Sequence, residues 1–263
     1  MREWNADAYH RVSNPQTTWG IQVLDRLPLG GDELVLDVGC GTGRLTELLL
    51  ERLPRGRAIG IDQSANMLET ARMHLSERFH RHVGFVQADA GELPFRNVAD
   101  AIFSTATFHW LLDHERLFRS LFTALAPGGR LVAQCGGGLN LQRIHARCAD
   151  LMQQPAFAPH FADWSDPWEF ADADTTGRRL RSAGFTDVRT SVESSPVFQP
   201  DAEAYREFIT HVIVRPHLAR LGDSALRNRF VDSITALAAT DSPAFELDYW
   251  RLNIEATKPI SGR

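Results

Sequence analysis

Short apolar runs alternate with segments of helical periodicity along the first half of the chain. The runs are bounded by turn residues and are nearly all apolar, which predicts buried strands. Between them, apolar residues recur every three or four positions, which predicts helices. The strands are expected at residues 34–38, 58–61, 83–86, 101–103 and 131–133, and the helices at residues 45–53, 67–75 and 117–125.

This alternation indicates an α/β fold. Strands without a polar face must be covered on both sides, and the helices between them suit right-handed crossovers between parallel neighbours. We therefore expect a doubly wound, mostly parallel sheet with helical cap insertions. In such sheets a ligand binds in the crevice beyond the carboxyl ends of the strands.

The second half of the chain follows a looser pattern. Helical periodicity recurs at residues 139–152, 175–183, 205–218 and 225–239, an irregular aromatic stretch covers 155–167, and extended runs are expected at 187–192 and 245–256. No internal repeat or linker divides the sequence, so we expect one domain over residues 1–263. Its expected parts are N-terminal lid helices (1–32), a ligand-binding core (33–136), helical cap segments (137–183 and 200–241) and terminal strands (184–199 and 242–263).

Composition and charge narrow the functional classes. Of the 263 residues, 43% are hydrophobic and 23% charged, and the formal net charge is −5, which is ordinary for a globular protein. No block of Lys and Arg would follow a phosphate backbone, so we expect no nucleic-acid partner. No apolar run approaches the roughly 18 residues of a membrane span, and the N-terminus lacks the apolar core of a secretion signal. We expect a cytoplasmic protein that acts on a small molecule, and the sequence indicates no particular oligomeric state.

The cysteines and histidines do not predict a metal site. Cys40, Cys135 and Cys148 are odd in number and lack C-x-x-C spacing, which argues against a disulfide framework and a structural zinc site. His80 and His82 lie close together, but no cysteine or acidic cluster accompanies them. We expect reduced thiols and no bound metal.

The stretch VLDVGCGTG at residues 35–43 ends the first predicted strand in a glycine-rich turn. Its glycines let a ligand approach the backbone closely, and the next helix points its N-terminal N–H groups into the crevice. The dinucleotide fingerprint G-x-G-x-x-G has its third glycine at the sixth position, but Arg44 stands there and Gly43 comes one residue early. Asp37, two residues before the first glycine, would repel a pyrophosphate and favours a cationic ligand.

The turn resembles motif I of the class I S-adenosylmethionine-dependent methyltransferases, an apolar strand with an acid followed by Gly-x-Gly-x-Gly. The resemblance covers about residues 33–136, the expected cofactor-binding core, and implies a Rossmann-like fold that binds S-adenosylmethionine. Asp62 closes the second strand, where a carboxylate can accept hydrogen bonds from both ribose hydroxyls, although alone it could equally cap the next helix. The resemblance further implies that Asp89 contacts the adenine amino group and that the Ala90 backbone contacts the ring. The remaining cofactor contacts that it implies are Asp37, Gly39, Cys40, Gly41, Gln63, Met67 and Thr105.

A wider likeness suggests the methyl acceptor. The chain is similar to the trans-aconitate methyltransferase group and its relatives, including juvenile hormone acid methyltransferases, in W-N-x-x-x-Y at residues 4–9, Gln16 before motif I, and the step to His109 and Trp110 after strand four. Those relatives esterify carboxylates, which are already anionic near neutrality and need no general base. Under this hypothesis Gln16, His109 and Trp110 hydrogen-bond the carboxylate. The N-terminal segment could form a lid over the cofactor, in which Tyr9 or Trp19 presents its ring to the substrate or the sulfonium. Alternatively, the N-terminal aromatic residues, among them Trp19, only fix the first helix to the core.

Several alternatives remain open at this point. A hydroxyl or phenol acceptor would need a base, for which His109, with an ordinary pKa near 6.5, is the candidate, and nitrogen or carbon acceptors are also possible. An NAD-dependent oxidoreductase is disfavoured by the glycine spacing and by Asp37, and a noncatalytic nucleoside-binding module would keep the turn but lack an open acceptor site. A nucleic-acid methyltransferase is disfavoured because strand four ends in STATFHW rather than in Asn/Asp-Pro-Pro-aromatic.

The cap segments are expected to select the substrate. Arg143, His211 and Arg215 could bind further acid groups or lie on solvated helix faces. The cap also carries large apolar side chains that could line a pocket or form the cap's own core. These are Phe157, Phe161, Trp164, Trp168 and Ile209.

Overall fold

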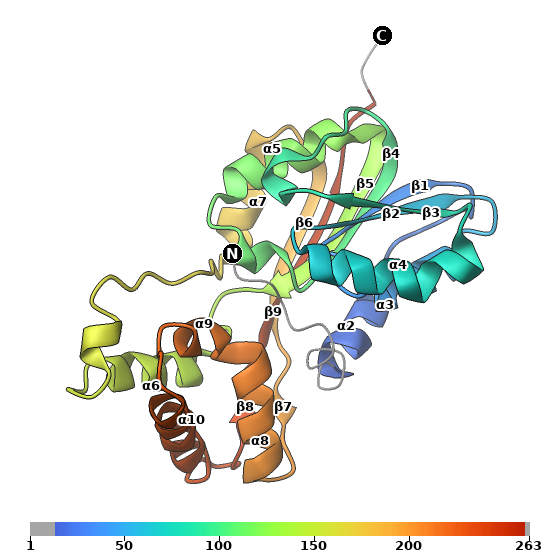
Figure 1. The fold of residues 1–263 in the computed structure, drawn as a ribbon. Helices are drawn as coiled ribbons and strands as arrows, with labels where there is room; N and C mark the ends of the chain where they lie inside the picture. The colour runs from blue at the N-terminus through green and yellow to red at the C-terminus, as the bar shows by residue number, and fades with distance from the viewer. Residues whose placement is uncertain (1–13, 261–263) are drawn as a thin grey trace.

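The protein is built around one seven-stranded sheet with helices on both faces (Figure 1). The computed structural model describes residues 14–260, and side chains from residue 17 onward. The strand order is β3-β2-β1-β4-β5-β9-β6, with β1 to β5 parallel and β9 antiparallel to both β5 and β6. The strands are β1 (Leu34–Val38), β2 (Arg57–Asp62), β3 (Val83–Gln87), β4 (Ala99–Thr105), β5 (Leu125–Gly136), β6 (Thr186–Ser194) and β9 (Trp250–Thr257). The expected doubly wound, mostly parallel sheet is confirmed.

Side chains alternate between the two faces of β1, and this alternation divides the core. Val35 faces the layer that contains α2 (Asn14–Asp25), α3 (Arg44–Glu51) and α4 (Ala65–Phe79). Leu36 and Val38 face the layer that contains α5 (His114–Ala124) and α7 (Ala173–Ser182). The strand order changes direction at β1, which lies between β2 and β4. The crevice of this sheet therefore lies at the carboxyl ends of β1 and β4.

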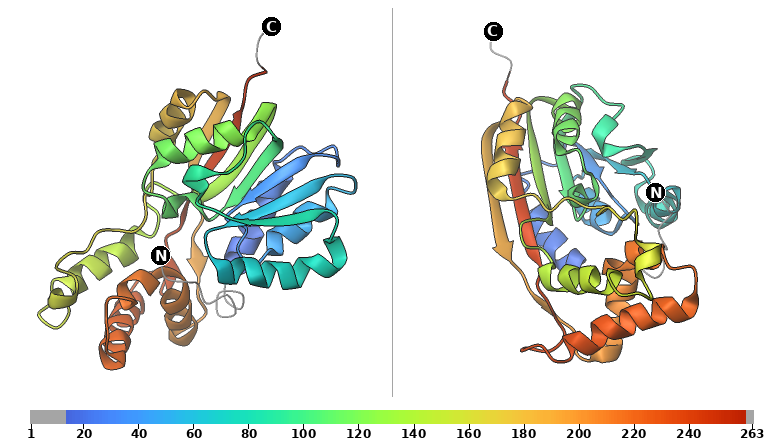
Figure 2. Two further views of the ribbon diagram at one scale, coloured as in Figure 1. Left: turned by 45° about the horizontal axis from the view of Figure 1, so that its top comes forward. Right: turned by 90° about the vertical axis from the view of Figure 1, so that its left-hand side faces the viewer.

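The cap forms a second lobe with its own hydrophobic core (Figure 2). Its helices are α6 (Gln142–Met152), η3 (Ala158–His160), α8 (Ala202–Phe208), η4 (Ile209–Ile213), α9 (Arg215–Leu218) and α10 (Ser224–Ala238), and a two-stranded sheet joins β7 (Val197–Phe198) to β8 (Glu246–Leu247). The fully buried Tyr205, Phe157 and Phe230 lie in this core. Trp19 of α2 also belongs to it, so the N-terminal helix touches both lobes.

The structure differs from the predicted helix at 205–218. The α-helix ends at Phe208, a π-turn follows, and the Val214 N–H donates to the Ile209 carbonyl oxygen at 2.8 Å before α9 begins. Pro216 has no N–H to donate back along the chain, so one continuous α-helix cannot pass through this point.

The boundaries of the cap also differ from the prediction. Helix α7 packs against the sheet, with Leu180 fully buried in the sheet core, so the first cap segment ends before α7 rather than at residue 183. The extended run predicted at 245–256 is divided into β8 in the cap and β9 in the main sheet. The chain therefore crosses from one lobe to the other at Asp248 and Tyr249.

Between residues 14 and 260, no helix has the length and apolar character that crossing a membrane requires. The same residues contain no group of three His, Cys, Asp or Glu side chains placed to hold a metal ion. Cys40, Cys135 and Cys148 are buried free thiols.

Candidate active site

The glycine turn after β1 is fixed to the end of β2 by its backbone. The N–H groups of Gly39 and Cys40 both donate to the Ile61 carbonyl oxygen, at 2.7 and 3.0 Å. Gly39 has φ +79° and faces Thr107, whereas Gly41 has φ +53° and open space where a side chain would begin. No side chain therefore covers the Gly41 backbone on its crevice side, so a ligand can approach it closely.

Asp62, at the end of β2, lies beside the glycine turn. Its Oδ2 accepts a hydrogen bond from the Gly41 N–H at 3.0 Å, and its Oδ1 accepts one from the Ser64 N–H at 2.9 Å. These bonds hold the carboxylate in one orientation beside the turn. A carboxylate oxygen has two acceptor sites, which suits a group that binds adjacent ligand hydroxyls in addition to backbone N–H groups.

Asp37 and Cys40 lie behind the turn. Asp37 is 2% exposed and accepts a hydrogen bond from Thr46 Oγ1 at 2.6 Å, and burial raises its pKa to about 7. Burial also raises the pKa of the Cys40 thiol. Neither side chain is part of the cleft wall, so the structure does not bring these two predicted contacts to the ligand. Asp62, not Asp37, is the carboxylate that faces the cleft beside the turn.

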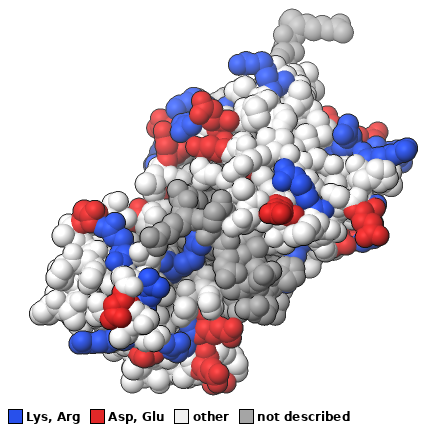
Figure 3. Space-filling model, in the orientation of Figure 1, with Lys and Arg blue, Asp and Glu red and all other residues white. Residues whose placement is uncertain are grey.

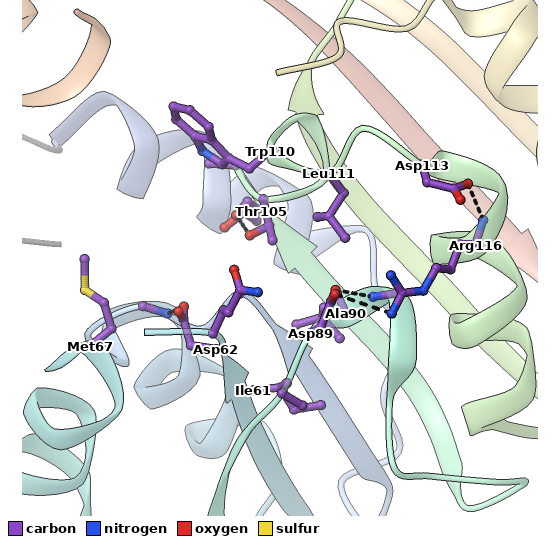
Figure 4. Close-up of a pocket in the computed structure, with 18 of the residues that line it drawn as sticks. Ile61, Asp62, Met67, Asp89, Ala90, Thr105, Trp110, Leu111, Asp113 and Arg116 are labelled. Carbon is purple, nitrogen blue, oxygen red and sulfur yellow. Dashed lines mark hydrogen bonds and ion pairs between the residues drawn. The ribbon is translucent and has the colours of Figure 1, made fainter. Parts of the chain in front are cut away.

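A cleft of about 340 Å³ opens beyond the ends of β1, β2 and β4. It contains most of the cofactor residues that the sequence predicted, and Figure 4 shows several of them converging from separate loops. Trp110, predicted on the acceptor side, lies in the same wall. The predicted residues in the wall are Gly39, Gly41, Asp62, Gln63, Met67, Asp89, Ala90 and Thr105.

The far end of the cleft carries an ion pair that the sequence did not reveal. Asp89 caps the short helix η1 (Ala90–Glu92) by accepting from the Gly91 N–H at 2.8 Å. Arg116 of α5 lies 3.6 Å from Asp89 Oδ2 and 2.8 Å from Glu92 Oε2, as Figure 4 shows for Asp89. Arg116 also lines the cleft, so a positive and a negative group stand side by side where the resemblance places adenine.

A second cavity, of about 60 Å³, adjoins the cleft. Ala106 and Trp110 lie in the walls of both spaces, which places the two side by side at the end of β4. His109 lines the second cavity but not the cleft. The turn η2 (Phe108–Trp110) thus directs neighbouring side chains to two adjoining spaces.

The protonation of His109 is set by its surroundings. Its Nδ1 accepts a hydrogen bond from the Gly136 N–H at 3.2 Å, so the ring proton of the neutral form resides on Nε2. Burial, the nearby charge of Arg251, and two further histidines lower the pKa of His109 to about 3. At neutral pH His109 is therefore an uncharged Nε2–H donor.

A network behind η2 holds this turn in place. His114 Nε2 lies 3.0 Å from the Phe108 carbonyl oxygen, and the Glu169 N–H donates to the His109 carbonyl oxygen at 2.8 Å. Arg179 pairs with Glu169 and lies 3.3 Å from His114 Nδ1. The carbonyl oxygens of Phe108 and His109 are thus bonded to groups outside the cavity.

The rest of the second cavity comes from distant parts of the chain that the sequence analysis did not connect. His145 of α6, Trp168 and Phe170 of the following loop, and Tyr249 and Arg251 at β9 all line it. Their separation in sequence leaves no local signal of the site. Only Trp168, among the cap residues singled out from the sequence, reaches this cavity.

The other predicted acceptor and cap residues have different surroundings. Tyr9 lies outside the described residues, and so does the side chain of Gln16. Trp19 is 8% exposed and packs edge-on against Tyr249. Arg143 forms an ion pair with Glu246 at 3.0 Å and is not part of the cavity wall. His211 and Arg215 are also not part of that wall, and Phe157, Phe161, Trp164 and Ile209 contribute to the cap core.

Comparison with known proteins places this geometry in a family. A methyltransferase domain family matches residues 36–133. A trans-aconitate 2-methyltransferase of Methylobacterium radiotolerans is 33% identical over 89% of this chain and 88% of its own length. The chain belongs to the class I S-adenosylmethionine-dependent methyltransferases. A trans-aconitate 2-methyltransferase of Acidovorax ebreus is 35% identical over 63% of this chain, and the match spans just under two thirds, 62%, of that relative.

Solved structures support the methyltransferase fold. The YcgJ protein of Bacillus subtilis superimposes with a TM-score of 0.65 at 16% identity, over 92% of this chain and 99% of that chain. Phosphoethanolamine N-methyltransferase 2 of Haemonchus contortus, in complex with S-adenosyl-L-methionine, gives 0.62 at 19% identity, over 97% of this chain and 56% of that chain.

The cleft fits S-adenosylmethionine, the cofactor of this family. The bare backbone at Gly41 and the oriented Asp62 carboxylate suit a nucleoside with adjacent hydroxyls. The glycine spacing disfavours a dinucleotide, because Gly43 comes one residue before the third glycine of that fingerprint.

Proposed function

We propose that this methyltransferase transfers the methyl group of S-adenosylmethionine to a carboxylate oxygen of a small acid. The observation that carries the proposal is the neutral His109 donor in a cavity that shares Ala106 and Trp110 with the cofactor cleft. When bound, S-adenosylmethionine supplies an electrophilic methyl group, and its transfer yields a methyl ester and S-adenosylhomocysteine.

The residues of the second cavity suit an anionic acceptor. The His109 Nε2–H and the Arg251 guanidinium are donors that can bind a carboxylate and orient one oxygen toward the cleft. Alignment of this kind can contribute about 7–11 kcal/mol to lowering the barrier of a bimolecular reaction. The trans-aconitate 2-methyltransferase relatives, named for a carboxylate substrate, also support this acceptor class.

The same geometry disfavours a hydroxyl acceptor with His109 as base. The Nδ1 lone pair is already engaged by the Gly136 N–H, and a pKa of about 3 makes the imidazole a weak base. A carboxylate needs no proton removal, because its ordinary pKa is about 4.3.

A small-molecule acceptor agrees with the surface. On the face shown in Figure 3, acidic and basic side chains of the described residues are interspersed, without the broad basic area that follows a phosphate backbone.

The test is incubation of the purified protein with S-adenosylmethionine and a panel of carboxylic acids, alcohols, phenols and amines. We expect S-adenosylhomocysteine to form only with acids, and the methylated product to release methanol under mild alkali, as esters do. An alkali-stable product from an alcohol, phenol or amine, with none from acids, would reject the proposal. Calorimetry with S-adenosylhomocysteine and with NAD is expected to show binding of the first alone.

A further inference from the structure

The wall of the second cavity is largely aromatic. Trp168 stacks on Phe170 with ring centroids 6.0 Å apart and planes at 21°, and Trp110 meets Trp168 edge-on at 6.2 Å. The His145 ring lies 4.5 Å from that of Trp168. Rings arranged in this way favour a flat or apolar body in the remaining space.

Charge is scarce in the same wall. Among the described residues that line the cavity, Arg251 is the one side chain with a full charge at neutral pH. Its Nε donates to Gln134 Oε1 at 3.3 Å, and its guanidinium lies 4.6 Å from the centre of the Trp19 ring. Burial lowers the pKa of His109 to about 3 and that of His145 to about 4, so both imidazoles are neutral.

A buried nitrogen in this wall lacks a hydrogen-bond partner among the described residues. It is Nε2 of His145. A polar atom buried without a partner is costly, and a ligand oxygen in the cavity would satisfy it. In its Nε2–H tautomer, neutral His145 adds a second donor to the one that His109 offers.

The two arginines of α6 form ion pairs away from the cavity. Arg143 pairs with Glu246 at 3.0 Å, and Arg147 pairs with Asp241 at 2.5 Å. Neither lines the cavity. A second and a third carboxylate on the acceptor would then have no cationic partner among the described residues of this wall, and burying a charge without a partner is strongly unfavourable.

We infer that the acceptor is a monocarboxylic acid with a flat or apolar body, held by Arg251, His109 and His145 at its carboxylate and by Trp168 and Phe170 along its body. The inference rests on the proposed function, which places the acceptor in this cavity. It separates this protein from a trans-aconitate enzyme, whose substrate carries three carboxylates.

The test compares trans-cinnamate with trans-aconitate, as methyl acceptors and as ligands titrated into the complex with S-adenosylhomocysteine. We expect kcat/KM for trans-cinnamate to be at least about 100-fold higher and its binding to be tighter. An equal or higher kcat/KM for trans-aconitate would overturn the inference and leave the proposed function intact. If neither acid is esterified, the proposed function is decided by the wider panel of acceptors. The titration still decides the inference, because tighter trans-aconitate binding or no binding of either acid would overturn it.

Variants of two neighbouring tryptophans sharpen the test. Trp168→Ala is expected to raise KM for trans-cinnamate about tenfold while leaving S-adenosylhomocysteine affinity unchanged, and Trp168→Phe is expected to restore most of the loss. Trp164, which stacks on His217 at 4.6 Å and does not line the cavity, is the matched control. An equal rise in KM in Trp164→Ala would show that the effect comes from the cap core, and would count against the inference. Thermal unfolding of each variant identifies any loss of folding.

Discussion

The carboxylate of Asp62 accepts a hydrogen bond from the backbone N–H of Gly41 at 3.0 Å, across 21 residues of sequence. This bond joins the end of β2 to the turn after β1, so the acid and the bare glycine backbone form one surface. A change at either position is therefore expected to affect both the shape of the turn and the binding of the cofactor.

Replacement of Asp62 by Asn tests the ribose contact. The amide keeps the size of the side chain, but its NH₂ group cannot accept a hydrogen bond, and the charge is lost. Because hydrogen bonds to charged groups contribute about 1.5–3 kcal/mol, we expect S-adenosylhomocysteine to bind roughly 10- to 150-fold more weakly by calorimetry. Glu92→Gln, at an exposed ion pair with Arg116, is the control and is expected to retain affinity. Unchanged affinity in Asp62→Asn would exclude Asp62 as a cofactor ligand.

Gly39 and Gly41 are expected to respond differently to alanine. A methyl group at Gly39 would lie 1.9 Å from Thr107 Oγ1, so Gly39→Ala is expected to lower the thermal unfolding midpoint strongly. At Gly41 nothing lies within 4 Å, so the cost in stability is that of a left-handed residue, about 1–2 kcal/mol.

The Gly41→Ala methyl group would instead project into the open space of the turn. We expect affinity for S-adenosylhomocysteine to fall at least about tenfold in Gly41→Ala, as measured by calorimetry on folded protein. A variant that is as stable and as tightly binding as the original protein would contradict the proposed approach of the cofactor to this backbone.

The pH dependence of catalysis distinguishes the two roles of His109. With a pKa lowered to about 3 by burial, His109 stays neutral as the pH falls from 9 to 6, so kcat/KM for a carboxylate is expected to show no inflection from this residue. His109→Phe, which removes the donor, is expected to lower kcat/KM about 10- to 100-fold at every pH in this range. An inflection near pH 6.5 that disappears in His109→Phe would instead identify a general base.

Stability should decrease in acid because buried histidines resist protonation. His217 is 1% exposed, and burial lowers its pKa to about 3, below the ordinary value of about 6.5. Between these values the unfolded chain binds the proton and the folded chain does not. The free energy of unfolding therefore falls with decreasing pH, by up to about 1.4 kcal/mol per pH unit for each such residue.

His217→Phe keeps a ring against Trp164 and removes the titrating group. We expect this variant to lose less stability than the original protein between pH 6.5 and 4.5, as measured by urea unfolding at each pH. His80→Gln, at an exposed position, is expected to leave the slope unchanged. The same slope in His217→Phe as in the original protein would show that His217 is not neutral in the folded state.

Local sequence patterns predicted the sheet and most of the cofactor cleft. Apolar strands with no polar face require cover on both sides, and parallel pairing brings their carboxyl ends to one edge. Gly41, Asp62 and Asp89 lie at or shortly after the carboxyl ends of β1, β2 and β3, which meet at one edge of the sheet. The resemblance to the methyltransferases supplied their expected roles. Alternation along β1 also explains Asp37, which lies on the same face as Val35, toward α3, where Thr46 holds it.

The second cavity, where we propose that the acceptor binds, was decided by the tertiary structure. His109, His145, Trp168 and Arg251 come from four elements, and no periodicity or spacing relates them. Their approach depends on how the cap packs over β5 and β9, and on the crossing of the chain between lobes at Tyr249. The sequence by itself determined the cofactor edge, because that edge follows from strand order and turn chemistry. The second cavity exists only after two separate hydrophobic cores have packed against each other, since its wall belongs to both lobes.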